Sequence, residues 1–410
     1  MASQQGIQSG SAAVVPFPRA YRLAAPVLPP FEPSVSSRIL LSPPHLVGCE
    51  LGSIQATLEA GWIAPAGPVP VAFEASIARA TGFGHVLAIA SGTAALHLGF
   101  RVLGVKPGDE VWTSSLTFIA SIAPAVQMGA VPRFIDASAA DWTMDIDLLR
   151  AELSAAARRG RLPRVVVPVD LYGQPADTLA ITEACAAWGV PVLSDSAESL
   201  GATLQGRHAG AGARLVALSF NGNKIITAGG GGALASDDAA LIAQARALAS
   251  QAKEAAPHYQ HETTGFSYGL SSVLAAVGLA QMTALEQRVA ARRAVHARYR
   301  EGLADLEGLH FIDEPAGSRS NRWLTAIRLD PARARAGREV LRLALAARDI
   351  ESRPVWKPLH LQPAFRDAPQ VGGAVAARLF EEGLCLPSGS NLAPLDQARV
   401  ISIIRQCCLA

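Results

Sequence analysis

Charge and cysteine are both scarce in this sequence. Only 17% of its 410 residues are Asp, Glu, Lys or Arg, and the formal net charge is +2. So small an excess of positive charge argues against nucleic acid and membrane surfaces as partners. The five cysteines have no C-x-x-C spacing of a zinc or redox site, so we expect no metal and a reducing, cytoplasmic location.

A membrane span is also missing from the pattern. The longest uncharged stretch, residues 111–132, contains two Pro, one Gln and five Ser or Thr, so we expect it to be buried core. Residues 1–37 are rich in Pro, Ser and Ala and lack the apolar stretch of a secretory signal. These residues contain almost no acidic side chains, which is also compatible with a transit peptide, but we expect a disordered or arm-like tail.

What is present is an alternation of short apolar runs and helical patterns from about residue 40. This is typical of an α/β fold with a mostly parallel sheet covered by helices on both faces. The candidate strands are almost wholly apolar, as strands buried on both faces should be, and cover residues 86–90, 110–113, 131–135, 165–169, 190–194, 215–220 and 232–235. Helices are expected between them at 93–103 and 179–188, each followed by a glycine.

The pattern changes in the last third of the chain. We expect one long helix over residues 273–306, a strand at 322–329, and helices at 338–348 and 394–406. Because the length exceeds what a single core usually supports, we predict two domains after the tail. The large one covers residues 38–285 and the small C-terminal α+β one residues 286–410.

Three places at the ends of candidate strands could carry chemistry. Ser91, Gly92 and Thr93 open a helix, where backbone N–H groups could approach a phosphate, although an ordinary helix cap has the same pattern. Asp195 could pair with a protonated pyridine nitrogen, bind a metal, act as a base or cap a helix. Lys224 lies among small residues just past a strand; burial there would favour a neutral amine that forms a Schiff base, whereas a surface lysine is the plainer alternative.

In chain order these features are a phosphate cradle, a carboxylate for a ring nitrogen and a lysine. With them the chain resembles, from about residue 39 to 405, the fold type I, pyridoxal phosphate-dependent nucleotide-sugar aminotransferases of the DegT/DnrJ/StrS type. The stretches SFNGNKIIT (219–227) and SDSAESLGA (194–202) are similar to the branch that aminates 4-keto-6-deoxy sugars attached to UDP or GDP. The other similar stretches are LSPPH (41–45), GWIAPAGP (61–68), SGTAALHL (91–98), LYGQPAD (171–177), SRPVWKPLHLQP (352–363) and LCLPSGSN (384–391).

The resemblance implies a role for each site residue. Lys224 would bind pyridoxal 5'-phosphate covalently and move protons, and Asp195 would hold the ring nitrogen. The other cofactor contacts would be Gly92, Thr93 and Ser219 to the phosphate, Phe118 stacked on the ring and Glu198 near the ring hydroxyl. Phe118 could instead be plain core, and Glu198 could favour a helix start. The nucleotide sugar would meet Arg353, Trp356, Lys357 and His360, which could also pack between the two domains.

The chain departs from the family in one stretch that reaches the cofactor phosphate of a neighbouring subunit. Where the family has Gly-aromatic-Asn-Tyr-Arg, this chain has Gly265-Phe266-Ser267-Tyr268-Gly269, and a further Asn is Ser272. Ser267 keeps one donor, but losing the Arg could cost about 1.5 to 3 kcal/mol of binding. The shared site implies a homodimer.

The resemblance predicts a transaminase that moves an amino group from glutamate to a sugar of the UDP-4-keto-6-deoxy-GlcNAc type, for bacterial surface glycans. Two alternatives stay open at this point. One is a dehydratase of the same fold, which Lys224 argues against because such enzymes have a histidine there. The other is a cofactor-binding regulator that has lost turnover. The choice between C3 and C4 of the sugar rests on the resemblance alone.

Overall fold

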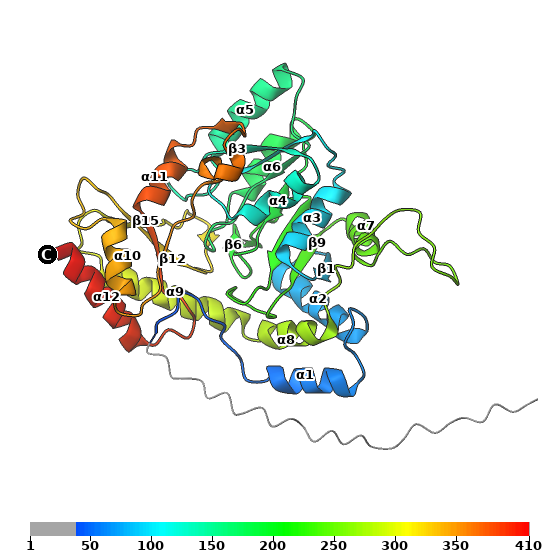
Figure 1. Ribbon diagram of the computed structural model, residues 1–410, viewed down its shortest axis with the longest axis horizontal. Helices are drawn as coiled ribbons and strands as arrows, with labels where there is room; N and C mark the ends of the chain where they lie inside the picture. The colour runs from blue at the N-terminus through cyan, green and yellow to red at the C-terminus, as the bar shows by residue number, and fades with distance from the viewer. Residues whose placement is uncertain (1–37, 410) are drawn as a thin grey trace, which may run out of the picture. The chain divides into compact units, whose positions relative to one another are not determined.

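The computed structural model describes residues 38–409, and the predicted tail at 1–37 lies outside them. Two four-stranded sheets, ordered β14-β3-β2-β4 and β1-β9-β8-β5, meet through bridges from Val166 to Val192 and from Val169 to Asp195. Together they make one central sheet (Figure 1). Its strands are β1 (His85–Ile89), β2 (Glu110–Ser114), β3 (Val131–Ile135), β4 (Val165–Val167), β5 (Leu193–Asp195), β8 (Leu215–Ser219), β9 (Gly232–Ser236) and β14 (Gln370–Val371).

The sheet is mostly parallel, as the sequence predicts. Neighbouring strands run parallel from β14 to β8, while β9 runs antiparallel to both β8 and β1. The carboxyl ends of β1, β2, β5 and β8 therefore meet at one edge, which is where open α/β sheets bind ligands.

Helices cover both faces of this sheet. Successive residues of a strand point to opposite faces, and accordingly Val165 and Val167 of β4 pack in the apolar cluster of α3, while Val166 packs in that of α5 and α6. The helices of this region are α2 (Pro68–Thr81), α3 (Gly92–Val102), α4 (Ala123–Gln127), α5 (Ile146–Arg158), α6 (Thr178–Ala186) and α7 (Ala239–Ala249). The predicted α/β class is thus confirmed.

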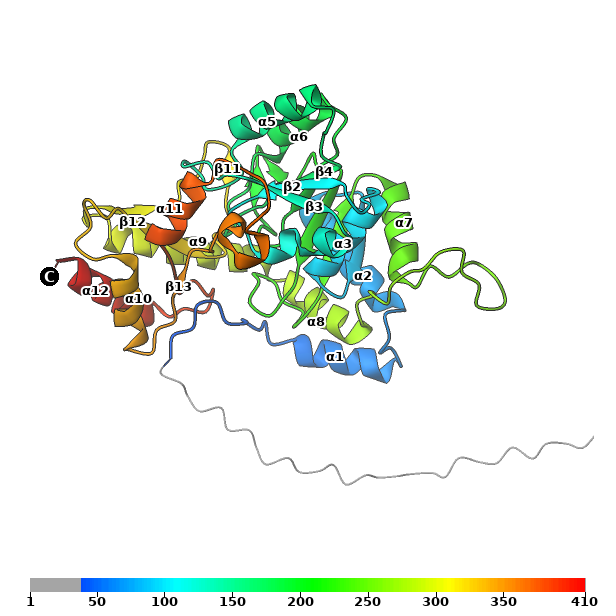
Figure 2. The same cartoon turned by 45° about the horizontal axis from the view of Figure 1, so that its top comes forward.

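The expected long helix over 273–306 is wrong in one respect, because it is two helices. α8 (Ser272–Met282) packs on α1 (Glu50–Glu59), and α9 (Leu285–Gly302) continues towards the C-terminal helices (Figures 1 and 2). Between them Thr283 N and Ala284 N donate to the carbonyl groups three residues earlier, and Ala284 has φ −106° and ψ 7°. These tighter bonds interrupt the α-helical ladder without a Gly or Pro, so the pattern of apolar residues gave no sign of the break.

The last part of the chain forms an antiparallel sheet in the order β10-β12-β15-β13 with its own apolar cluster. Its elements are β10 (Leu309–Phe311), β12 (Thr325–Leu329), β13 (Arg353–Pro354), β15 (Gly383–Leu386), α10 (Arg338–Ala346), α11 (Ala374–Glu382) and α12 (Pro394–Leu409). β14 from this region pairs with β3, so the C-terminal part also extends the central sheet. A small three-stranded sheet, β11-β6-β7, consists of Ser318–Arg319, Thr203–Leu204 and Arg207–His208. The boundary at residue 285 stays a prediction.

The strand expected at 322–329 begins only at Thr325. Arg322 has a positive φ of 52°, and Trp323 N donates to Asn321 Oδ1 at 2.8 Å, so these residues form a turn before the strand. Across residues 38–409, no helix combines the length and the apolar character that a membrane crossing would require.

Candidate active site

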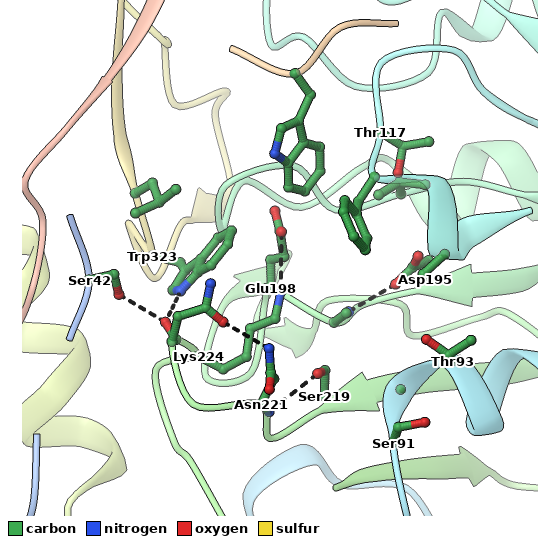
Figure 3. Close-up of a pocket in the computed structure, with 18 of the residues that line it drawn as sticks. Ser42, Ser91, Thr93, Thr117, Asp195, Glu198, Ser219, Asn221, Lys224 and Trp323 are labelled. Atoms are coloured by element: carbon green, nitrogen blue, oxygen red, sulfur yellow. Dashed lines mark hydrogen bonds and ion pairs between the residues drawn. The ribbon is translucent and has the colours of Figure 1, made fainter. Parts of the chain in front are cut away.

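A cavity of about 620 Å³ opens at the carboxyl edge of the central sheet (Figure 3). Its walls come from the ends of β1, β2, β5 and β8 and from the C-terminal part of the chain. The residues predicted for the site that line it are Gly92, Thr93, Phe118, Asp195, Glu198, Ser219, Lys224, Arg353 and Trp356. Ser267, Lys357 and His360 lie outside the cavity wall.

The start of α3 and the end of β8 form one end of the cavity. Ser91 caps the helix by accepting a hydrogen bond from Ala94 N at 3.0 Å, and the first N–H groups of α3 have no acceptor within the helix. A Cβ atom added at Gly92 would lie 3.0 Å from Ser219 Cβ, so glycine permits this close approach. Thr93 and Ser219 add hydroxyl groups, and the arrangement suits an anionic group such as a phosphate.

Asp195 lies at the end of β5 and is 5% exposed. Ser121 Oγ donates to its Oδ2 at 2.6 Å, and Ala197 N donates to Oδ1 at 3.2 Å. Because Ser121 uses its proton here, Thr117 Oγ1, at 2.7 Å, must donate to Ser121 Oγ. Burial raises the pKa of Asp195, while the bond from Ser121 and the charge of Lys224 oppose that rise.

Lys224 and Glu198 form an ion pair inside the cavity (Figure 3). Lys224 Nζ lies 3.3 Å from Glu198 Oε1, and the side chains are 13% and 3% exposed. Tyr172 N donates to Glu198 Oε2 at 2.8 Å. Glu198 lies in a turn, so the plainer view of it as a helix-start residue does not hold. Lys224 is not a surface lysine.

Burial gives two acidic groups near the cavity unusual proton affinities. Desolvation raises the pKa of Glu198 to about 7, although Lys224 opposes the shift, and raises the pKa of Asp170 to about 6. The folded protein therefore keeps a proton on Glu198 at pH values where the unfolded chain has released it. Stability from this difference is present at low pH and is lost as the pH rises from the ordinary 4.5 to about 7.

We expect Glu198→Gln to flatten this pH dependence. The free energy of unfolding of the cofactor-free wild type should fall between pH 5 and 7 by at most about 3 kcal/mol more than that of the variant. Urea unfolding at a series of pH values measures the difference. Asp170→Asn is the control, because it should alter only the lower part of the same range. Equal slopes for wild type and Glu198→Gln would contradict the assignment.

Aromatic side chains line the opposite wall. Phe118 is 56% exposed, so it is not a core residue, and its ring centroid lies 5.8 Å from that of Trp356. Trp356 in turn lies 5.1 Å from Tyr172, whose hydroxyl oxygen accepts a bond from Trp356 N at 3.0 Å. A flat ring between the sheet edge and Phe118 would thus meet an aromatic face.

The charged and histidine side chains of the stretch at 352–363 do not all reach the cavity. Arg353 lines the cavity and donates to Glu351 Oε1 from Nε at 3.2 Å and from Nη2 at 3.0 Å. Lys357 is exposed at the surface. His360 Nδ1 lies 2.5 Å from Ser115 Oγ, and Leu359 N donates to Ser115 O at 2.8 Å. His360 thus contacts the loop that carries Phe118.

The stretch that departs from the family packs against the loop at residues 61–67. A Cβ atom added at Gly269 would lie 2.5 Å from Pro65 Cβ, so no larger side chain fits unless this loop moves. Ser272 Oγ lies 2.8 Å from Ala64 O and 2.7 Å from Ala66 O, which holds the same loop. Ser267 is exposed. Gly269 and Ser272, the residues that replace the Arg and the further Asn of the family, therefore both contact the loop at 61–67.

Three residues that shape the site were missed in the sequence. Ser121 holds Asp195, Tyr172 N holds Glu198, and the Trp323 ring centroid lies 4.1 Å from Lys224 Nζ. Each belongs to another segment, and no local pattern linked it to its partner, although Tyr172 lies in the LYGQPAD stretch just after a strand. Among residues 38–409, no group of His, Cys, Asp and Glu could hold a metal ion.

The cavity fits pyridoxal phosphate by the chemistry of its donors. Its largely enclosed lysine, its buried and hydrogen-bonded carboxylate, and the glycine at the start of α3 match an aldehyde, a ring nitrogen and a phosphate, respectively. Gly92, Thr93 and Ser219 would hold the phosphate, Asp195 the ring nitrogen and Lys224 the aldehyde carbon.

Comparisons with known proteins agree with this chemistry. The profile of the DegT/DnrJ/EryC1/StrS aminotransferase family matches residues 46–405. EpsN of Bacillus subtilis (strain 168), which bears the name of a pyridoxal phosphate-dependent aminotransferase, is 46% identical over 371 residues, 90% of this chain and 95% of its own. GDP-perosamine synthase of Caulobacter vibrioides is 33% identical over 90% of this chain and 98% of its own. A DegT DnrJ EryC1 StrS aminotransferase structure from Brucella abortus has a TM-score of 0.81 and 31% identity over 88% of this chain and 95% of its own.

Proposed function

The chain belongs to the DegT/DnrJ/EryC1/StrS family of pyridoxal phosphate-dependent sugar aminotransferases, and we propose its substrates from that premise. The donor is glutamate, and the acceptor is a 4-keto-6-deoxy nucleotide sugar of the UDP-4-keto-6-deoxy-GlcNAc type. The observation that carries the proposal is the single cavity in which Lys224, Asp195 and the start of α3 meet. Glutamate and the keto sugar would give 2-oxoglutarate and the 4-amino sugar.

Asp195 and Lys224 are proposed to have separate roles in the reaction. Pyridoxal phosphate, when bound, supplies an electron sink and carries the amino group between the two substrates. Ser121 and Ala197 N donate to Asp195 and favour its carboxylate form, which would keep a ring nitrogen protonated. Among residues 38–409, Lys224 has the only amine at the cavity wall, and it moves the proton at the reacting carbon.

Substrate recognition is proposed for the residues nearer the cavity mouth. The side chain of Arg353 is 68% exposed, and its planar donors suit a diphosphate. Trp356 offers a ring face to a sugar. His360 and Lys357, which the resemblance also assigns to substrate, would act from outside the wall, His360 through the Ser115 loop.

We propose a homodimer, and two observations support it. Ser267 lies exposed in the stretch that, in the family, serves the neighbouring subunit. Large apolar side chains are also exposed along residues 46–71: Leu46, Leu51, Leu58, Ile63 and Val71. Covering such side chains is a usual reason for association. Light scattering of the purified protein measures the mass directly.

The biological setting is proposed from the same relatives. An amino sugar on a nucleotide carrier suits the synthesis of surface polysaccharides or other glycans, and the cysteine pattern suits the cytoplasm. The dehydratase alternative is disfavoured because Lys224 lies in the cavity. The regulator alternative is disfavoured because the relatives that match nearly the whole chain are aminotransferases by name, and packing with Pro65 gives a steric reason for glycine at 269.

The test is an assay of the purified protein with pyridoxal phosphate, glutamate and one of two acceptors. These are UDP-4-keto-6-deoxy-GlcNAc and GDP-4-keto-6-deoxy-mannose, and mass spectrometry follows the amino sugar and 2-oxoglutarate. We expect amination of the UDP sugar, with at least about tenfold higher kcat/KM, since a few pocket contacts decide such choices. Preference for the GDP sugar would overturn the proposed acceptor. A bound cofactor that reacts with no donor would favour the regulator.

A further inference from the structure

Trp323 lies directly beside the amine of Lys224 (Figure 3). The centroid of its indole ring is 4.1 Å from Lys224 Nζ, within the range of a cation–π contact, and Trp323 is 3% exposed. Glu198 Oε1 lies 3.3 Å from the same nitrogen. The amine is therefore in contact with an aromatic face and a carboxylate in a place with little water.

The backbone that carries Lys224 is fixed by the same tryptophan. Trp323 Nε1 donates to Asn223 O at 2.7 Å, and Ser42 Oγ donates to this oxygen at 2.8 Å. Thus one indole ring contacts the lysine side chain by its face and the preceding peptide group by its edge. Two segments far apart in the sequence converge on the carbonyl before Lys224.

A buried arginine of α9 contacts both Trp323 and Ser42, the two residues that donate to Asn223 O. Arg292 is 2% exposed; it donates to Ser42 Oγ at 3.0 Å, to Ser388 O at 3.1 Å and also to Trp323 O. Burial lowers the pKa of Arg292 to about 9. A guanidinium held by carbonyl and hydroxyl oxygens in this way fixes their relative positions.

We propose that Trp323 is a positioning residue for Lys224, and that its indole face, together with Glu198, forms the resting site of the free amine. The proposal rests on the proposed aminotransferase function, in which Lys224 is released from the cofactor for part of each cycle. During that part a lysine of four rotatable methylene groups would otherwise sample many rotamers. The resting site keeps it near the carbon whose proton it moves.

The first test is the equilibrium of the glutamate half-reaction. If the indole face stabilises free Lys224, Trp323→Leu shifts the equilibrium towards the lysine-attached cofactor. The ratio of 2-oxoglutarate to glutamate at half-conversion of the visible band then falls by about tenfold. Trp323→Phe keeps an aromatic face without Nε1–H and is expected to stay within about threefold of wild type. Ser42→Ala removes the other hydrogen bond to Asn223 O. Its effect therefore shows how much of any shift comes from the bonds to this carbonyl and how much from the indole face.

The control and a second measurement keep the outcome clear. Trp188→Leu replaces a tryptophan that is 40% exposed just after α6, and it should not shift the equilibrium. In cofactor-free protein, Lys224→Ala should change the tryptophan emission, and this change should vanish in the Trp323→Phe background. This measurement needs no reaction, so it tests the resting site even where glutamate fails as donor. Equal shifts for the Leu and Phe variants, or an emission change that survives Trp323→Phe, would overturn the proposal.

Discussion

Replacing Lys224 with alanine is expected to lower the rate of amino transfer by about 10⁴-fold or more. The variant loses both the covalent attachment point and the base that moves the proton, and the described cavity wall contains no second amine. Steady-state release of 2-oxoglutarate measures the rate, and the visible spectrum reports covalent attachment of the cofactor. We expect the variant to bind the cofactor without the band of the attached form.

Lys224→Arg is the matched control, since it keeps a positive charge beside Glu198 but forms no attachment. It should be as inactive as the alanine variant while retaining the thermal midpoint of the wild type more closely. An alanine variant within tenfold of the wild-type rate would remove Lys224 from the mechanism. Loss of activity in Lys224→Ala that is restored by added methylamine would support the role as a base.

The central sheet was predictable in large part because most of its strands are short, largely apolar runs, although the two-residue strand β14 was not predicted. β3 has the predicted limits, β8 ends one residue earlier than predicted, and β1 is shifted by one residue at both ends. Parallel strands buried on both faces leave such runs in a sequence, and their carboxyl ends brought Gly92, Asp195 and Ser219 to one edge. The break between α8 and α9 was not predictable, because no glycine or proline marks it.

The site was predictable only where its residues follow their own strands. Ser121 contacts Asp195 across 74 positions of sequence, and Trp323 contacts the Lys224 loop across 100. No periodicity links such positions, since the contact depends on how whole segments pack. The turn that aims Trp323 depends on the positive φ of Arg322, which is uncommon for a residue with a long side chain. The glycine at 269 likewise depends on a residue distant in sequence, because Pro65 lies where a larger side chain would be.

Replacing Asp195 with asparagine is expected to lower kcat by about 10² to 10³-fold, comparable to removing one buried electrostatic contact to a reacting group. The amide has the shape of the carboxylate but carries no charge, so it cannot keep a ring nitrogen protonated. Ser121 and Ala197 N remain as donors, and one of them must face the new NH₂ group. Stopped-flow measurement of the glutamate half-reaction separates this loss from changes in substrate binding.

Ser121→Ala leaves the carboxylate of Asp195 in place and removes only the hydrogen bond that Ser121 Oγ donates to it. Without the bond from Ser121 Oγ, the pKa of Asp195 should rise further, since burial already raises it and the bond opposes the rise. The ionised form is then lost at a higher pH as the solution is acidified, so the acid limb of the pH–rate profile moves upward. We expect the rate of the variant to fall below that of wild type by about tenfold on the acid limb, and to approach wild type at high pH, where the carboxylate of both proteins is ionised. A loss independent of pH would show that Ser121 acts by packing alone, and a normal rate in Asp195→Asn would assign the ring nitrogen to another group.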